Sequence, residues 1–154
     1  MLEVPAVIYQ LEALAERVDF FSVGSNDLIQ YLLAVDRNNA RVSGLYDACQ
    51  PAVLRALDYI ARESRRLNVS ASVCGELAGD PIGALLLIGM GYQVLSMNAP
   101  NLSRVRAAIR RVSMEGAQNL VNDVLALHSL TETRELVYQR MKEWELAHLL
   151  PPRD

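Results

Sequence analysis

Two short polar segments of this chain carry side chains that can bind a phosphate group and its metal ion. The first, Gly24-Ser25-Asn26-Asp27, follows the apolar run Phe20–Val23, and Arg37 lies about three helical turns further on. The second, Cys74–Asp80, closes another apolar run in the same way. An amide, a carboxylate and a guanidinium near a strand end are suited to holding a phosphate and its metal. Two polar strand ends of one kind indicate a shared catalytic face.

Each candidate residue also has a simpler structural interpretation. Glu3 and Asp27 would suit Mg²⁺, because this ion takes one or two carboxylates plus phosphate oxygens. Equally, Glu3 is explained as a surface acid and Asp27 as an acid at a helix N-terminus. Asn26 is a possible helix N-cap, and Arg37 a solvated loop arginine. Cys74 fits a buried structural thiol as well as a catalytic acid. The residues by themselves leave both interpretations open.

The elements that position these residues follow a strand–helix alternation. Apolar runs predict four strands, at Leu2–Val4, Phe20–Val23, Val69–Cys74 and Val94–Met97. Helical spacing predicts the helices between and after them, at Pro5–Arg17, Asn26–Val35, Pro51–Leu67, Pro81–Met90 and Leu102–Val112. The pattern is then purely helical, at Glu115–Leu127 and Thr131–Leu150, with a stop at Pro151-Pro152.

The order βαβαβαβα predicts an α/β fold with a parallel sheet, because crossovers of this length join parallel strands. Four such units make half of a (β/α)8 barrel of the TIM type, followed here by C-terminal helices. In that fold the chemistry lies at the carboxyl ends of the strands, where Glu3, Asn26, Asp27, Cys74 and Asn98 fall. An open doubly wound sheet is the rival, and the absence of a G-x-G-x-x-G fingerprint disfavours it.

Composition excludes several classes of protein. The chain has 154 residues, enough for one domain with a real core, and a net charge of -3, which gives no electrostatic case for nucleic acid. No apolar run reaches the ~18 residues of a membrane span, and the N-terminus lacks the features of a signal peptide. Cys49 and Cys74 lack CxxC spacing, so we expect no disulfide and a cytoplasmic location. A strand at residue 1 indicates a piece cut from a longer chain.

Three motifs give the chain a family resemblance. Phe20–Leu28, Ala34–Asn39 and Cys74–Asp80 resemble, in order and spacing, the C-terminal part of the phosphoenolpyruvate–protein phosphotransferases, the Enzyme I family of the bacterial phosphotransferase system. The similarity runs from Leu2 to about Leu127. Further segments are closest to the nitrogen-related paralogue, namely Tyr31–Asn39, Leu45-Tyr46-Asp47 and Gly91–Asn98. Pyruvate phosphate dikinases and phosphoenolpyruvate synthases share the barrel and are the nearest alternatives.

The resemblance implies a phosphoenolpyruvate-binding barrel that passes a phosphoryl group to a histidine on a separate domain, and then to a small phosphocarrier protein. Carried over to this chain, it implies that Glu3 and Asp27 ligate Mg²⁺. It implies that Asn26 and Arg37 hold the phosphate, and that Cys74 exchanges a proton with the methylene carbon of the enolate. The chain departs from the family at two positions: serine replaces the common threonine at Ser25, and glutamine the frequent histidine at Gln50.

We expect the phosphorylated histidine to lie outside this chain. His128 and His148, in the predicted helical tail, lack the Thr-Ser-His type of context that the family uses. The predicted organisation is a partial barrel at residues 1–127 and a helical tail at residues 128–154. A second hypothesis, of another class, is a dimerisation and regulatory module, since the family forms homodimers through its C-terminal domain. We expect no nucleic-acid or membrane partner.

Overall fold

Three short strands form a parallel sheet in which neighbours in space are also neighbours in sequence. The computed structural model describes residues 1–150, and the strands are β1 (Phe20–Gly24), β2 (Ser70–Cys74) and β3 (Val94–Ser96). They lie in the order β1-β2-β3, all parallel. The register aligns their carboxyl ends, with Gly24 opposite Cys74 and Cys74 opposite Ser96. An α/β fold with a parallel sheet is therefore confirmed, whereas closure into a barrel stays a prediction.

The predicted first strand, Leu2–Val4, is wrong in extent. Only Leu2 pairs, in a parallel bridge to Val23, with its N–H donating to the Ser22 carbonyl and its carbonyl accepting from the Gly24 N–H, at 2.7 and 3.0 Å. Pro5 lies in the first turn of a 3-10 helix, so the chain leaves the sheet at once. Leu2 nevertheless lies beside β1 at the edge of the sheet.

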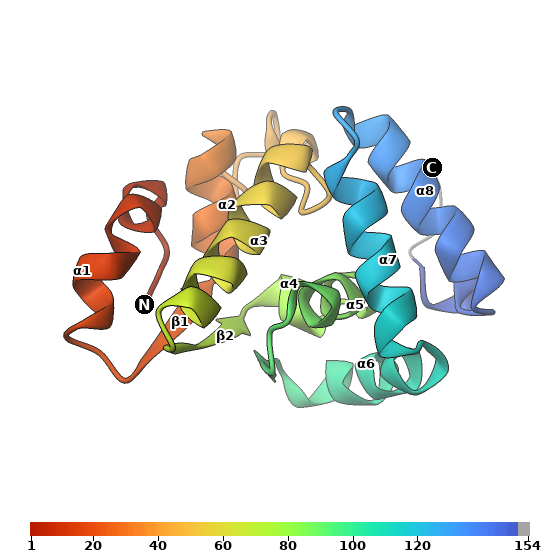
Figure 1. Cartoon of the computed structure of the whole chain (residues 1–154). Coiled ribbons are helices and arrows are strands. Elements are labelled where there is room, and N and C mark those ends of the chain that lie inside the picture. The colour runs from red at the N-terminus through yellow and green to blue at the C-terminus, as the bar shows by residue number, and fades with distance from the viewer. Residues whose placement is uncertain (151–154) are drawn as a thin grey trace.

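Helices fill most of the remaining chain (Figure 1). The α-helices are α1 (Leu11–Ala15), α2 (Ser25–Leu33), α3 (Pro51–Arg66), α4 (Glu76–Gly79), α5 (Pro81–Met90), α6 (Ala99–Arg111), α7 (Met114–Leu125) and α8 (Leu130–Glu143). The 3-10 helices are η1 (Pro5–Gln10), η2 (Ser43–Leu45) and η3 (Ala147–Leu149).

Two predicted helices are interrupted. The stretch expected as one helix over Pro5–Arg17 is η1 followed by the short α1. The stretch expected over Thr131–Leu150 ends as an α-helix at Glu143, because Glu145 adopts a left-handed φ of 60° and the chain then turns into η3. The stop expected at Pro151-Pro152 lies outside the described residues.

The two faces of the sheet have different surroundings. Side chains alternate along a strand, and Phe21, Val23 and Val73 are buried on the face that α3 crosses (Figure 1). On the opposite face Phe20 and Val94 are 61% and 58% exposed. The site-bearing sheet is thus covered on one side and open on the other, as expected of a strand layer that does not close on itself.

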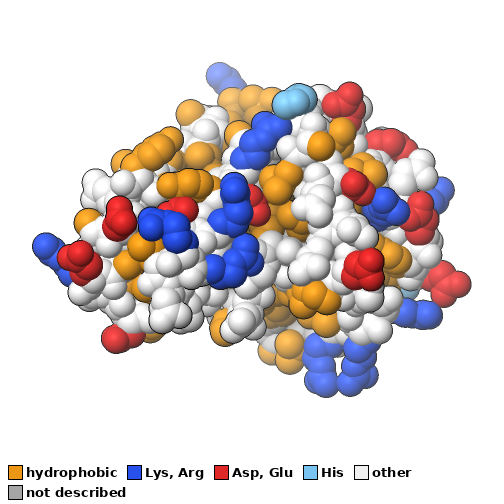
Figure 2. Space-filling view, in the orientation of Figure 1, with side chains coloured by type: hydrophobic (Ala, Val, Ile, Leu, Met, Phe, Trp, Pro, Cys, Tyr) orange, Lys and Arg blue, Asp and Glu red, His pale blue; other side chains and the backbone are white. Residues whose placement is uncertain are grey.

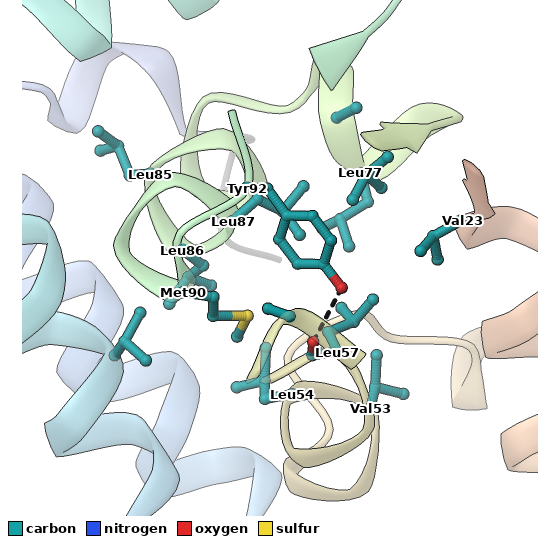
Figure 3. Close-up of a cluster of buried hydrophobic side chains, with 14 of the residues drawn as sticks. Val23, Val53, Leu54, Leu57, Leu77, Leu85, Leu86, Leu87, Met90 and Tyr92 are labelled. Carbon is teal, nitrogen blue, oxygen red and sulfur yellow. Dashed lines mark hydrogen bonds between the residues drawn. The ribbon is translucent and has the colours of Figure 1, made fainter. Parts of the chain in front are cut away.

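The core packs the sheet, α3, α5 and α7 around large aliphatic side chains (Figure 3). Tyr92 is buried among them, and its hydroxyl donates to the Leu57 carbonyl oxygen at 2.9 Å, which satisfies the polar atom. Val137 and Met141 of α8 join the same cluster. The boundary predicted between residues 127 and 128 stays a prediction. None of the helices described in residues 1–150 is long and apolar enough to cross a membrane.

Candidate functional site

The aligned carboxyl ends of the three strands surround a shallow pocket of about 290 Å³. Its lining comes from β1–α2, β2–α4 and β3–α6, through Asn26, Cys74, Gly75, Glu76, Ser96, Met97, Asn98 and Asn101. The sequence places three of these residues at separate strand ends. In the structure they line one pocket: Asn26, Cys74 and Asn98.

Ser25 and Asn26 bind the β1–α2 turn to the β2–α4 turn. The buried Ser25 Oγ donates to the Cys74 carbonyl oxygen at 2.8 Å, and Asn26 Oδ1 accepts from the Glu76 N–H at 3.0 Å. Gly75 lets the two turns approach, since its φ is 113° and an added Cβ would lie 2.5 Å from Ser25 Oγ and 2.8 Å from Asn26 Oδ1. The serine at position 25 thus keeps a structural role that needs only a hydroxyl.

Cys74 is half-buried at the edge of this pocket rather than enclosed in the apolar core. Its Sγ is 3.4 Å from the Val23 carbonyl oxygen, to which the thiol donates, and 3.9 Å from Ser22 Oγ. A thiol with polar neighbours and an open side is accessible to a ligand.

Arg37 lies in the loop after α2 and reaches back toward the start of that helix. Its Nη2 is 3.6 Å from Asp27 Oδ1, and its backbone N–H donates to Gln30 Oε1 at 3.3 Å. Nη1 is buried and has no hydrogen-bond partner among residues 1–150. An unpaired buried donor costs about 1–3 kcal/mol, so a bound anion at this position would be stabilising. Asp27 and Arg37, predicted as site residues, are therefore in contact.

Tyr46, to which sequence reasoning gave no role, contacts a residue of the candidate site. It follows η2, and its hydroxyl donates to the Asn26 carbonyl oxygen at 3.2 Å. Burial raises the pKa of Tyr46, and the negative charges of Glu76 and Asp27 raise it further. The adjacent Arg37 guanidinium acts in the opposite direction and lowers this pKa. The side chain therefore lies amid the charged groups of the site. The signal was present, since Leu45-Tyr46-Asp47 is part of the family resemblance.

Glu3 reaches the carboxyl end of β1 from the neighbouring edge. A Cβ added to Gly24 would lie 2.6 Å from Glu3 Cγ and 2.8 Å from Glu3 Oε1, so glycine provides the room for this carboxylate. Asp27 lies in the first turn of α2, directly after β1. Both carboxylates thus flank one strand end.

No group of three or more His, Cys, Asp or Glu side chains that could hold a metal occurs in residues 1–150. A pair of carboxylates does fit Mg²⁺, because this ion commonly takes one or two protein carboxylates and completes its shell with water and substrate phosphate oxygens. The donor set is therefore consistent with a magnesium site that the substrate completes.

A larger hollow of about 950 Å³ lies between the loop that precedes α3, the start of α5 and helix α8. Burial, followed by the charges of Asp47 and Asp80, raises the pKa of Cys49 in this hollow to about 12. The Cys49 thiol is thus held in its neutral form. Asp80 serves as the N-cap of α5, accepting from the Gly83 N–H at 2.8 Å, and burial raises its pKa.

The two histidines lie away from the pocket at the strand ends. Nδ1 of His128 is 3.1 Å from Arg55 Nη2, in the segment between α7 and α8. His148 belongs to η3. Neither lines the pocket that contains Cys74.

Residues 1–114 match the family model described as PEP-utilising enzyme, PEP-binding domain, where PEP is phosphoenolpyruvate. Three curated relatives align with most of the chain. Proteins named phosphoenolpyruvate-dependent phosphotransferase system, from Salmonella typhimurium and Escherichia coli, are 46% and 47% identical over 150 residues, which is 97% of this chain and 20% of each relative. A phosphoenolpyruvate-protein phosphotransferase from Borreliella burgdorferi is 41% identical over 133 residues, 86% of this chain and 23% of the relative.

The chain spans about a fifth of the length of the relatives from Salmonella typhimurium and Escherichia coli. The family match, in contrast, covers the strands, the pocket at their carboxyl ends and the loop that carries Arg37. The resemblance read from the three sequence motifs is confirmed, and the chain belongs to the family of PEP-utilising enzymes, in the part described as the PEP-binding domain.

Proposed function

We propose that this chain binds PEP and Mg²⁺ at the carboxyl ends of its strands, as part of a phosphotransferase. The phosphoryl group then passes to a histidine on a separate domain and from there to a small phosphocarrier protein. The observation that carries the proposal is the buried Nη1 of Arg37, which has no hydrogen-bond partner among the described residues and lies next to Asp27 at the start of α2. The names of the relatives favour a phosphotransferase over the dikinase and synthase alternatives. We assign the chain to the nitrogen-related type on its sequence motifs.

Arg37 and Asn26 are the proposed phosphate ligands. A guanidinium offers planar, paired donors to phosphate oxygens, and Nη1 has this capacity unused. Asn26 Oδ1 is already engaged by the Glu76 N–H, which leaves its Nδ2 hydrogens to donate to an anion. Position 26 is also in the first turn of α2, where the helix dipole favours negative charge.

Glu3 and Asp27 are the proposed holders of Mg²⁺, together with oxygens of the substrate. When bound, the ion neutralises negative charge on the phosphoryl group during transfer. Asp27 contacts Arg37 in the structure, so the carboxylate that would hold the metal also orients the proposed phosphate-binding guanidinium.

Cys74 is the proposed proton donor to carbon. Transfer of the phosphoryl group breaks its bond to the enol oxygen of PEP and leaves the enolate of pyruvate. The thiol gives its proton to the methylene carbon of that enolate, forming pyruvate, and the thiolate regains a proton from solvent. The half-buried, pocket-lining position of Cys74 supports this role.

A titration of the 154-residue chain with PEP, in the presence and absence of Mg²⁺, tests the proposal. We expect metal-dependent binding that weakens strongly in Arg37→Ala and recovers only in part in Arg37→Lys, because lysine keeps the charge but not the planar fork. Arg41→Ala is the matched control, an exposed arginine of the same loop. Equal loss of binding in Arg41→Ala and Arg37→Ala would contradict the assignment.

A second candidate function is a dimerisation and regulatory module. The exposed Phe20 and Val94 on the open face of the sheet favour it, because they lie on one side and line the same hollow. Self-association without any PEP binding would support this alternative against the first.

A further inference from the structure

We propose that helix α8 controls the PEP site, through an ion pair between Arg134 and Asp47 that fixes Tyr46 against the phosphate-binding residues. The inference rests on the proposed function, since it concerns the affinity of the same site. Tyr46 and Arg134 act here as positioning residues. Neither is assigned any contact with PEP.

The loop between α2 and α3 carries two residues that contact the site, Arg37 near its start and Tyr46 near its end. Ala34 leaves α2 in a left-handed conformation, and the Arg37 N–H is held by Gln30 Oε1. The start of the loop is therefore attached to α2 itself. These contacts do not restrain the end of the loop, where Tyr46 lies.

Asp47 supplies that attachment. Its Oδ1 accepts from the Cys49 N–H at 2.6 Å, and its Oδ2 accepts from Arg134 Nε at 2.8 Å and also from Arg134 Nη2. The Asp47 side chain is only 12% exposed. A shielded carboxylate with a two-donor guanidinium partner is held more firmly than a surface ion pair, for which water competes. The loop end is thus fixed to α8, 87 residues away in sequence.

Tyr46 transmits this attachment to the site because it directly precedes Asp47. Its hydroxyl donates to the carbonyl oxygen of Asn26, and its side chain lies near the charge of Arg37. If the Arg134–Asp47 pair is lost, Tyr46 is no longer held in place. Its side chain can then move away from Asn26, at the start of α2, and from the Arg37 guanidinium. The expected consequence is weaker PEP binding without loss of the fold.

Two measurements on the full 154-residue chain test the proposal: amide hydrogen exchange of residues 34–50, and the Kd for PEP with Mg²⁺. In Arg134→Gln we expect exchange of the loop amides to accelerate and the Kd to rise about 3- to 10-fold, the equivalent of one lost hydrogen bond. Tyr46→Phe should raise the Kd by a similar factor. Arg134→Lys should recover part of the affinity, because it restores the charge alone.

The matched controls remove comparable groups elsewhere. Arg140 also lies on α8, and Arg140→Gln removes its ion pairs with Asp123 and Glu143. Tyr9→Phe removes the hydroxyl of an exposed tyrosine. Both should leave loop exchange and Kd unchanged. If the two residues act as one contact, an Asp47→Asn/Arg134→Gln double variant should have a Kd for PEP no higher than that of either single variant.

Unchanged loop exchange and Kd in Arg134→Gln would overturn the proposal. An effect of Arg134→Gln that Arg140→Gln reproduces would also overturn it, since it would reflect general weakening of α8. If the unmodified chain binds no PEP, the proposed function fails in this chain. The exchange data then decide on their own whether α8 holds the loop.

Discussion

Arg37 is the residue whose surroundings bear most directly on ligand binding. Nη2 faces Asp27 at 3.6 Å, too long for a good hydrogen bond, while Nη1 is buried without a partner in residues 1–150. Cys74, which lines the pocket at the strand ends, contacts polar atoms only through its sulfur, at 3.4 and 3.9 Å. Arg37 and Cys74 thus keep hydrogen-bonding capacity that a bound substrate could use.

Cys74→Ala should separate binding from turnover. We expect the 154-residue chain to bind PEP with unchanged Kd, because the thiol is assigned to a step after phosphoryl transfer. In a chimera in which this chain replaces the matching segment of the Escherichia coli relative, turnover should fall by about 10²–10⁴-fold, as for loss of a general acid. Label transfer from PEP measures the rate. Full turnover in this variant would reduce Cys74 to a structural residue.

Cys49 should give the fold an alkaline instability. Burial raises the pKa of this thiol from 9.0 to about 12, so the folded state keeps a proton that the unfolded chain loses above pH 9. The unfolded state then binds fewer protons, and the free energy of unfolding falls as pH rises from 9 to about 12, by at most about 1.4 kcal/mol per pH unit.

Chemical denaturation across this pH range measures the slope. Cys49→Ala should have a shallower slope than the unmodified chain, whatever its absolute stability, because the other titrating groups are common to both. Parallel slopes would mean that Cys49 ionises freely in the folded state.

Helices α5 and α7 pack closely against each other, and Gly89 permits this approach. A Cβ at Gly89 would lie 2.4 Å from the carbonyl oxygen of Ala117, a backbone atom that cannot turn aside. Gly89→Ala should therefore destabilise the fold by about 1–3 kcal/mol, even though alanine is the better helix former. Gly44→Ala is the control, with nothing within 4 Å of the added atom. Urea midpoints measure the difference, and equal midpoints would refute the close-packing argument.

The elements that the sequence predicted well are those with strong local patterns. The helix expected at Pro51–Leu67 spans Pro51–Arg66, because its apolar face repeats over four turns and proline marks its start. The errors arise where tertiary geometry decides. Leu2–Val4 pairs at one residue only, since the chain turns into η1, and a left-handed Glu145 ends the last long helix early.

The same distinction holds for the site. Asn26, Asp27 and Cys74 follow apolar strands, so their common position at the strand ends could be predicted from the alternation alone. Tyr46 could not be placed in this way. Its hydrogen bond to Asn26 depends on the path of a loop, for which hydrophobic periodicity gives no signal.

At the level of the whole molecule, charge and apolar surface are distributed unevenly. Lys and Arg side chains gather over the outer face of α3 in Figure 2, where Arg55, Arg62, Arg65 and Arg66 are exposed. The open face of the sheet instead presents Phe20 and Val94. The face with the exposed apolar residues is the one that the remaining half of a predicted barrel would cover.

The chain should not accept a phosphoryl group itself. The sequence contains two histidines, and His128 is next to Arg55 while His148 lies in η3, both away from the pocket that Cys74 lines. A phosphoryl donor bound at the strand ends therefore has no acceptor imidazole in the pocket lining. Incubation with ³²P-labelled PEP and Mg²⁺, followed by gel electrophoresis at alkaline pH, should leave the protein unlabelled. The chimera with the Escherichia coli relative serves as the positive control. Acid-labile label that disappears in His128→Ala or His148→Ala would show that this chain carries its own acceptor, and would remove the need for a separate histidine domain.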